Sequence, residues 1–165
     1  RISLTVMGRR CIIDPSSRSA SIDGEELEPI TGMLVLLYLS GAGDAQVTGN
    51  LISFRQLPGG EVFFPTFRGR VIEAIGELFL DRPENLLDAA GTLGAKRAEL
   101  GDVSVRIDVF SKLPLTIILW RGDDEVPGSA NVLFDESASR IMDTEDLALV
   151  GSLLVASLVK ARSML

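Results

Sequence analysis

The segment from Leu115 to Trp120 reads Leu-Thr-Ile-Ile-Leu-Trp and is apolar at every position except Thr116. A strand that is apolar on both faces is typical of the centre of a sheet. The preceding segment from Val103 to Val109 alternates valine or isoleucine with polar residues, which indicates a strand with one buried face. The short link from Ser111 to Pro114 predicts a hairpin between the two strands.

Other strands are expected on either side of this pair. Ile2 to Val6 alternates apolar and polar residues, and Cys11 to Ile13 is its expected antiparallel partner. Ser19 to Asp23 and Asn131 to Phe134 are further short strand candidates. The stretch from Gly91 to Gly101 is expected to be a mobile loop because glycines interrupt it.

Helical patterns occupy the remaining segments. Leucine richness and a candidate Thr31 cap favour a helix over Met33 to Leu39. Apolar residues recur at helical spacing from Phe67 to Phe79, and Pro83 suits the first turn of another helix. Asp143 is the expected cap of a last helix. We therefore predict an α+β fold, with a mainly antiparallel sheet packed against three or four helices.

Length and charge limit the possible partners. The 165 residues are enough for one domain, so we expect a single domain over residues 1–165. The sequence starts at Arg1 without Met, so we expect this domain to be the C-terminal part of a longer protein. The formal net charge of −7 disfavours nucleic acids and anionic membrane surfaces as partners. The longest uncharged run near the C-terminus, Leu147 to Val159, is too short to span a bilayer.

The sequence contains one cysteine, Cys11, and no histidine. This composition excludes Ser-His-Asp and Cys-His catalysis, imidazole metal sites and a cysteine cage within this chain. We expect Cys11 to be a buried structural thiol, no cofactor within this chain, and a reducing, cytoplasmic location.

An acidic corner follows the central strand. Asp123, Asp124 and Glu125 come just after Trp120, and Asp135 follows the next strand. Carboxylates are ligands that suit Mg²⁺ or Ca²⁺, and Trp120 is a candidate ligand platform beside them. The alternative is a solvated turn whose charges keep the sheet edge soluble, with Trp120 belonging to the core.

A second candidate site lies at Pro58-Gly59-Gly60. Backbone N–H groups of Gly59 and Gly60 could approach an anion, with Arg55, Arg68 or Arg70 adding positive charge. The alternative is an ordinary tight turn that needs glycine for a positive φ.

The helical run from Leu147 to Val159 is uncharged and contains small residues. It is therefore expected either to be buried in the core or to contact a protein partner or a second copy of the chain.

Five segments resemble an uncharacterised prokaryotic family of domains of unknown function, found mainly in anaerobes. These segments are Gly49 to Gly60, Leu113 to Trp120, Asp123 to Pro127, Leu133 to Asp135 and Glu145 to Leu147. Some members carry an iron–sulfur cluster domain ahead of this one, similar to that of corrinoid proteins, so the resemblance implies a role near redox or corrinoid-dependent one-carbon metabolism. The family has no established activity to transfer.

Two functions follow from these observations. The first is a non-catalytic binding or accessory domain, favoured by the absence of histidine, the single cysteine and the acidic charge. The second is a small enzyme that uses the carboxylates at 123–125 and 135 with a divalent metal ion.

Overall fold

The segment from Leu115 to Trp120 lies in the central strand of the sheet. In the computed structural model, which describes residues 1–165, β8 (Leu113–Trp120) is buried at every residue except Trp120. It pairs antiparallel with β7 (Val103–Phe110) on one side and with β9 (Ser129–Asp135) on the other. The predicted central hairpin is therefore confirmed.

The rest of the sheet extends from this centre. An N-terminal meander of four antiparallel strands joins β7 through one residue pair, Val6 with Phe110. Its strands are β1 (Ile2–Val6), β2 (Arg9–Asp14), β3 (Ser19–Ile22) and β4 (Glu25–Glu26). On the far side β5 (Leu51–Ser53) pairs with β9, and β6 (Lys96–Ala98) pairs with β7 outside the main strand order.

Four helices accompany the nine strands. They are α1 (Pro29–Ala42), a continuous helix made of α2 (Gly60–Phe67), a π-helical turn (Arg68–Ile72) and α3 (Glu73–Phe79), then α4 (Glu84–Gly91) and α5 (Thr144–Ser163). Two 3₁₀ turns cover Phe54–Gln56 and Glu136–Arg140. The predicted α+β class, an antiparallel sheet with three or four helices, is confirmed.

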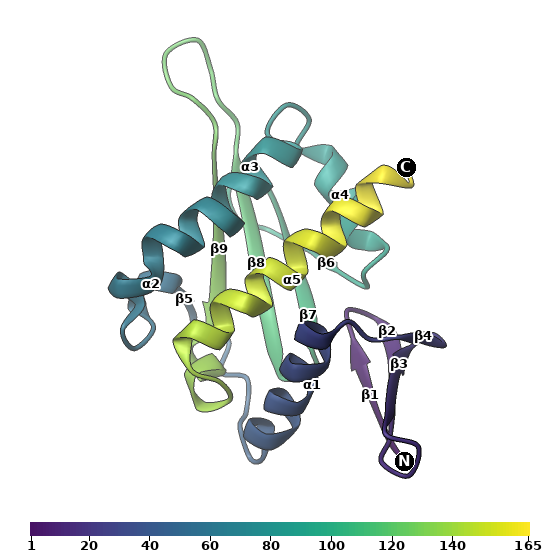
Figure 1. Cartoon of the computed structure of the whole chain (residues 1–165). Coiled ribbons are helices and arrows are strands. Elements are labelled where there is room, and N and C mark those ends of the chain that lie inside the picture. The colour runs from purple at the N-terminus through teal and green to yellow at the C-terminus, as the bar shows by residue number, and fades with distance from the viewer.

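The helices cover one face of the sheet (Figure 1), with α3 and α5 crossing in front of β8 and β9. Leu147, Val150 and Leu154 of α5 are fully buried in the core that this packing creates. Aromatic side chains pack where α2 meets the sheet: the rings of Phe54 and Phe67 stack with their centroids 4.0 Å apart.

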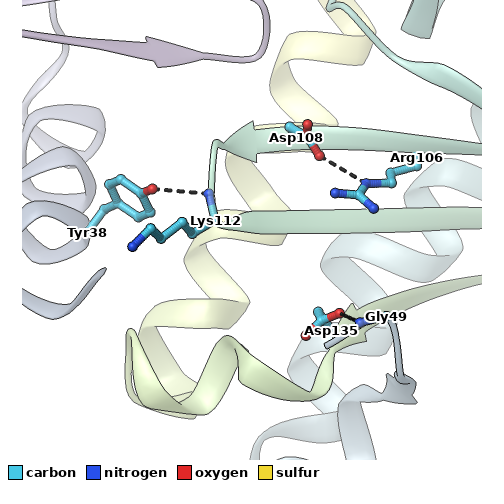
Figure 2. A network of polar contacts seen from close by, with 6 residues as sticks. All are labelled: Tyr38, Gly49, Arg106, Asp108, Lys112 and Asp135. Atoms are coloured by element: carbon cyan, nitrogen blue, oxygen red, sulfur yellow. Dashed lines mark hydrogen bonds and ion pairs between the residues drawn. The ribbon is translucent and has the colours of Figure 1, made fainter. Parts of the chain in front are cut away.

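Helix α1 is fixed to the turn between β7 and β8. The Tyr38 ring stacks on Phe110 at 4.4 Å, and its hydroxyl accepts a hydrogen bond of 3.1 Å from the backbone N–H of Lys112 (Figure 2). Near the end of α1, a Cβ on Gly41 would overlap the carbonyl oxygen of Ile141. Only glycine therefore allows α1 to approach this segment so closely.

Three local predictions were wrong. Thr31 is not a cap, because α1 begins at Pro29, whose fixed φ suits a first helical turn. The helix predicted from Phe67 begins at Gly60 instead, and the π-helical turn after it disturbs the 3.6-residue spacing that sequence patterns depend on.

The third wrong prediction is the loop from Gly91 to Gly101, which contains β6. This edge strand exposes Lys96 and Arg97, so it lacks the apolar alternation that indicates a strand. Among the helices, none combines the length and apolar character that crossing a bilayer requires.

Candidate functional site

The acidic residues after β8 form the tip of a hairpin. The Asp123 carboxylate accepts hydrogen bonds from the backbone N–H groups of Glu125, at 2.8 Å, and Val126, at 2.6 Å. These bonds, led by the one from Val126, lower the pKa of Asp123. The carboxylate of Asp123 is thus used to shape the turn, while Asp124 and Glu125 are exposed. Figure 1 shows this connection projecting beyond the helices.

Asp135 lies at the opposite end of the same hairpin. Strands β8 and β9 are antiparallel, so residues 123–125 follow the end of β8, whereas Asp135 lies beside the start of β8, where Leu115 pairs with Phe134. The structure therefore does not bring together the four carboxylates of the predicted acidic corner. No group of three or more Asp, Glu or Cys side chains has an arrangement that could hold a metal ion.

The carboxylate of Asp135 is buried and fully hydrogen-bonded. It accepts bonds from the backbone N–H groups of Thr48, Gly49 and Ser137 and from the hydroxyls of Thr48 and Ser137, at 2.7 to 3.1 Å. Figure 2 shows the bond from Gly49. Burial alone raises the pKa of Asp135, but these hydrogen bonds outweigh it and hold the pKa at about 2. Asp135 therefore ties the loop before β5 to the end of β9.

Trp120 is the last residue of β8 and remains 40% exposed. It shares one face of β8 with Thr116 and Ile118, because side chains alternate along a strand, whereas Leu115, Ile117 and Leu119 of the other face belong to the main core. Its backbone neighbour across the ladder is Ser129. A Cβ on Gly101 would lie 3.3 Å from the indole nitrogen, so the loop after β6 covers part of the ring.

Arg55, Gly59 and Gly60 do come together, at the start of α2. Gly59 has a φ of 68°, and a Cβ on Gly60 would overlap the carbonyl oxygen of Phe54, so the two glycines are needed to form the turn. The Arg55 guanidinium lies 4.0 Å from the centroid of the Phe64 ring and 3.7 Å from the Glu61 carboxylate. Through these contacts, Arg55, Gly59 and Gly60 have structural roles at the start of α2.

A cavity lies away from these residues, in a groove between the N-terminal meander and the last turns of α5. Its volume is about 600 Å³. One wall comes from β1, β3, β4 and the start of α1, and the other comes from α5 and the loop after α4. Its apolar lining comprises Val6, Met7, Ile22, Leu27, Leu93, Leu153, Ala156, Ala161 and Met164.

The charged residues without a salt-bridge partner differ in sign between the two walls. Glu25, Glu26 and Glu28 line the meander side, and none of them takes part in a salt bridge. Lys160 lines the α5 side and is also without a salt-bridge partner. Arg9, the other cation of the groove, is already paired with Asp23 at 2.8 Å. We name this site the meander–α5 groove.

No sequence pattern predicted this groove, although the helix expected to contact a partner contributes to its wall. The run from Leu147 to Val159 buries one side in the core and gives Leu153, Ala156 and Ser157 to the groove wall. A smaller cavity of about 230 Å³ lies further towards the start of the same helix, between α5 and α2. The one signal available from the sequence was the uncharged helical run itself, because such a run need not be buried on all its sides.

Cys11 lies under the meander wall of the groove. It is fully buried on β2, opposite Leu4 on β1 and Ile22 on β3. Burial raises the pKa of the thiol, which keeps it protonated and poorly nucleophilic. This environment is the one expected of a structural cysteine.

Comparison with known families decides the assignment. The family model described as a domain of unknown function, DUF3786, matches residues 1–157. The chain belongs to this family. No curated protein and no solved structure matches the chain. The match extends over both walls of the meander–α5 groove as far as Ser157, so most of the groove falls within the DUF3786 domain.

Proposed function

We propose that this DUF3786 domain is a non-catalytic binding or accessory module and that the meander–α5 groove is its binding site. The observation that supports this most strongly is the cavity of about 600 Å³, with an apolar floor and charged residues on both walls. Ligand-binding cavities of proteins fall in the range of about 300–1,000 Å³ and combine apolar linings with a few polar groups.

The way in which the groove is built favours binding. Its floor includes residues that are fixed by the core, such as Val6, which is 1% exposed, and Leu93, which is 8% exposed. Its rim includes Ala156 and Met164, which are exposed. A rigid apolar floor with an accessible rim allows a partner to bury apolar surface without reorganising the domain.

The partner that we propose is a protein that binds the outer side of the helix from Leu147 to Val159. The alternative partner is a second copy of the chain. We further propose that this pairing serves redox or corrinoid-dependent one-carbon metabolism in the cytoplasm of anaerobes. The resemblance of the five segments named above supports this setting, and the single buried cysteine is compatible with it.

The test is affinity capture from a cell lysate at low salt, with the full chain as bait. Ala156→Trp places an indole in the groove from an exposed position, and Val159→Trp is the matched control, because Val159 is exposed on the same helix but does not line the groove. We expect a protein that is retained by the wild type and by Val159→Trp and lost with Ala156→Trp. Equal retention by all three baits, or no retained protein, would contradict the proposal.

A further inference from the structure

We propose that the occupant of the meander–α5 groove is a basic amphipathic segment of a partner protein, with apolar side chains on one side and lysine or arginine on the other. This inference rests on the proposed binding function and goes further, because it names the chemistry of the partner. It follows from the distribution of charge and apolar surface between the two walls.

The meander wall provides three negative charges within four residues. Glu25 and Glu26 form β4, and Glu28 directly precedes α1. All three are exposed, and no cation of the chain forms a salt bridge with any of them. Carboxylates that lie together on a groove wall without cations of their own favour a ligand that supplies them.

The cations of the groove do not offset this charge. Arg9 is held by Asp23, with its Nε 2.8 Å from the carboxylate. Lys160 is on α5, which forms the opposite wall. An anionic ligand would find one ammonium group and would face three carboxylates across the groove, so a cationic ligand is favoured.

The α5 wall determines the other side of the occupant. Between Leu153 and Met164 it presents apolar or small side chains, broken only by Ser157 and Lys160. Leu27 and Ile22 add apolar surface at the base of the meander wall. A segment that fits both walls has apolar side chains towards α5 and cationic side chains towards β4, which is the pattern of an amphipathic helix or strand.

The acidic wall also distinguishes this occupant from other apolar ligands. Anionic lipid surfaces and fatty acids would bring negative charge against Glu25, Glu26 and Glu28, and the net charge of −7 on the chain adds to that repulsion. A second copy of this chain would bring another net negative surface. A basic segment of a different protein avoids both costs.

The experiment measures binding of three synthetic peptides to the full chain by fluorescence anisotropy. The peptides share the same apolar residues at helical spacing and carry lysine, glutamine or glutamate at their other positions. At low salt we expect the lysine peptide to bind about tenfold more tightly than the glutamine peptide, as three individually weak exposed ion pairs allow. The glutamate peptide should bind most weakly, and the differences should shrink as salt is added.

Two matched variants locate the effect. The triple change Glu25→Gln, Glu26→Gln and Glu28→Gln should remove the preference for lysine. The control triple change Glu77→Gln, Glu99→Gln and Asp124→Asn removes the same charge from exposed positions outside the groove and should keep it. Ala156→Trp should weaken binding of every peptide, whereas Val159→Trp should not.

Each other outcome has a defined meaning. If all three peptides bind equally and Ala156→Trp weakens them all, the groove is a binding site but the basic partner is wrong. If the lysine preference survives the groove triple change, or if no peptide binds, this inference is overturned. The small cationic amphiphile dodecyltrimethylammonium, tested below its micellar concentration, provides a last comparison. If it binds and no peptide binds, the occupant of the groove is a small ligand and not a protein segment.

Discussion

The central strands and the N-terminal meander belong to the same sheet but are held very differently. Strands β7 and β8 pair from Val103 with Leu119 to Phe110 with Leu113, with one irregularity between Asp108 and Phe110, and β8 is buried except at Trp120. The meander joins β7 only at its end, where Val6 pairs with Phe110 and the N–H of Met7 donates to the carbonyl oxygen of Val109, and most of β1 is exposed. Stability is therefore concentrated in the centre, while the meander is free to serve as a wall of the groove.

The largest effect is expected from truncating the centre. Ile117 is completely buried on β8, so Ile117→Ala should lower the free energy of unfolding by about 3–4 kcal/mol through lost apolar burial and the cavity left behind. Chemical denaturation measures this change. A loss below about 1 kcal/mol would show that the central strand does not carry the stability we assign to it.

A second prediction concerns the carboxylate that ties the loop before β5 to β9. The folded-state pKa of Asp135, about 2, is lower than its ordinary value of 3.8, so the folded protein binds this proton less readily than the unfolded chain. The resulting stabilisation of about 2 kcal/mol is fully present above about pH 4 and disappears as the pH falls towards 2.

Asp135→Asn should remove this stabilisation. Denaturation of the wild type and the variant between pH 2 and pH 7 would show two curves that converge at low pH, because the wild-type carboxylate is protonated there. Parallel curves across that range would contradict the role of Asp135 as a charged acceptor.

The third prediction addresses the meander directly. Leu4 is only half-buried on β1, so Leu4→Ala should cost about 1 kcal/mol, well below the cost at Ile117. Hydrogen exchange should also show amides of β1–β4 opening at a lower free energy than those of β7–β9. Equal protection of the two regions would mean that they unfold as one unit and that the meander is not less stable than the central strands.

The smallest effect is expected at the hairpin tip. Asp123→Ala removes the carboxylate that accepts hydrogen bonds from the backbone N–H groups of Glu125 and Val126 in an exposed turn, so it should lower the free energy of unfolding less than any other change named here. Binding of Mg²⁺ or Ca²⁺, followed by titration calorimetry, should be the same for the wild type and Asp124→Asn. Specific binding that Asp124→Asn abolishes would restore the acidic corner as a site.

The sequence predicted the central region well because neighbouring signals agree there: Val103 to Val109 alternates as a strand does, and a short link joins it to the apolar run from Leu115 to Trp120. It failed where distant partners determine a residue's role. Asp135 follows a strand and was expected to share an acidic site, but its carboxylate is enclosed by Thr48 and Gly49, more than eighty residues away in the sequence. No local pattern indicates such partners.

The groove was out of reach for the same reason. Its walls come from segments near Val6, Glu25, Leu93 and Ala156, and each of them alone has the pattern of an ordinary strand, turn or helix. Only the folded arrangement places the glutamates of β4 opposite α5. The run from Leu147 to Val159 suggested a partner, but not that its final turns would face the meander.

The close approach of α1 to Ile141 has a consequence for how this family varies. A side chain at position 41 would overlap the carbonyl oxygen of Ile141, and the same helix begins at the groove rim that contains Glu28 and Thr31. We therefore expect a residue outside the groove to influence the groove's shape through the position of α1. Among related chains, glycine at position 41 should therefore persist even where the lining residues diverge to suit different partners. Homologues that have lost this glycine should also have reshaped the opening.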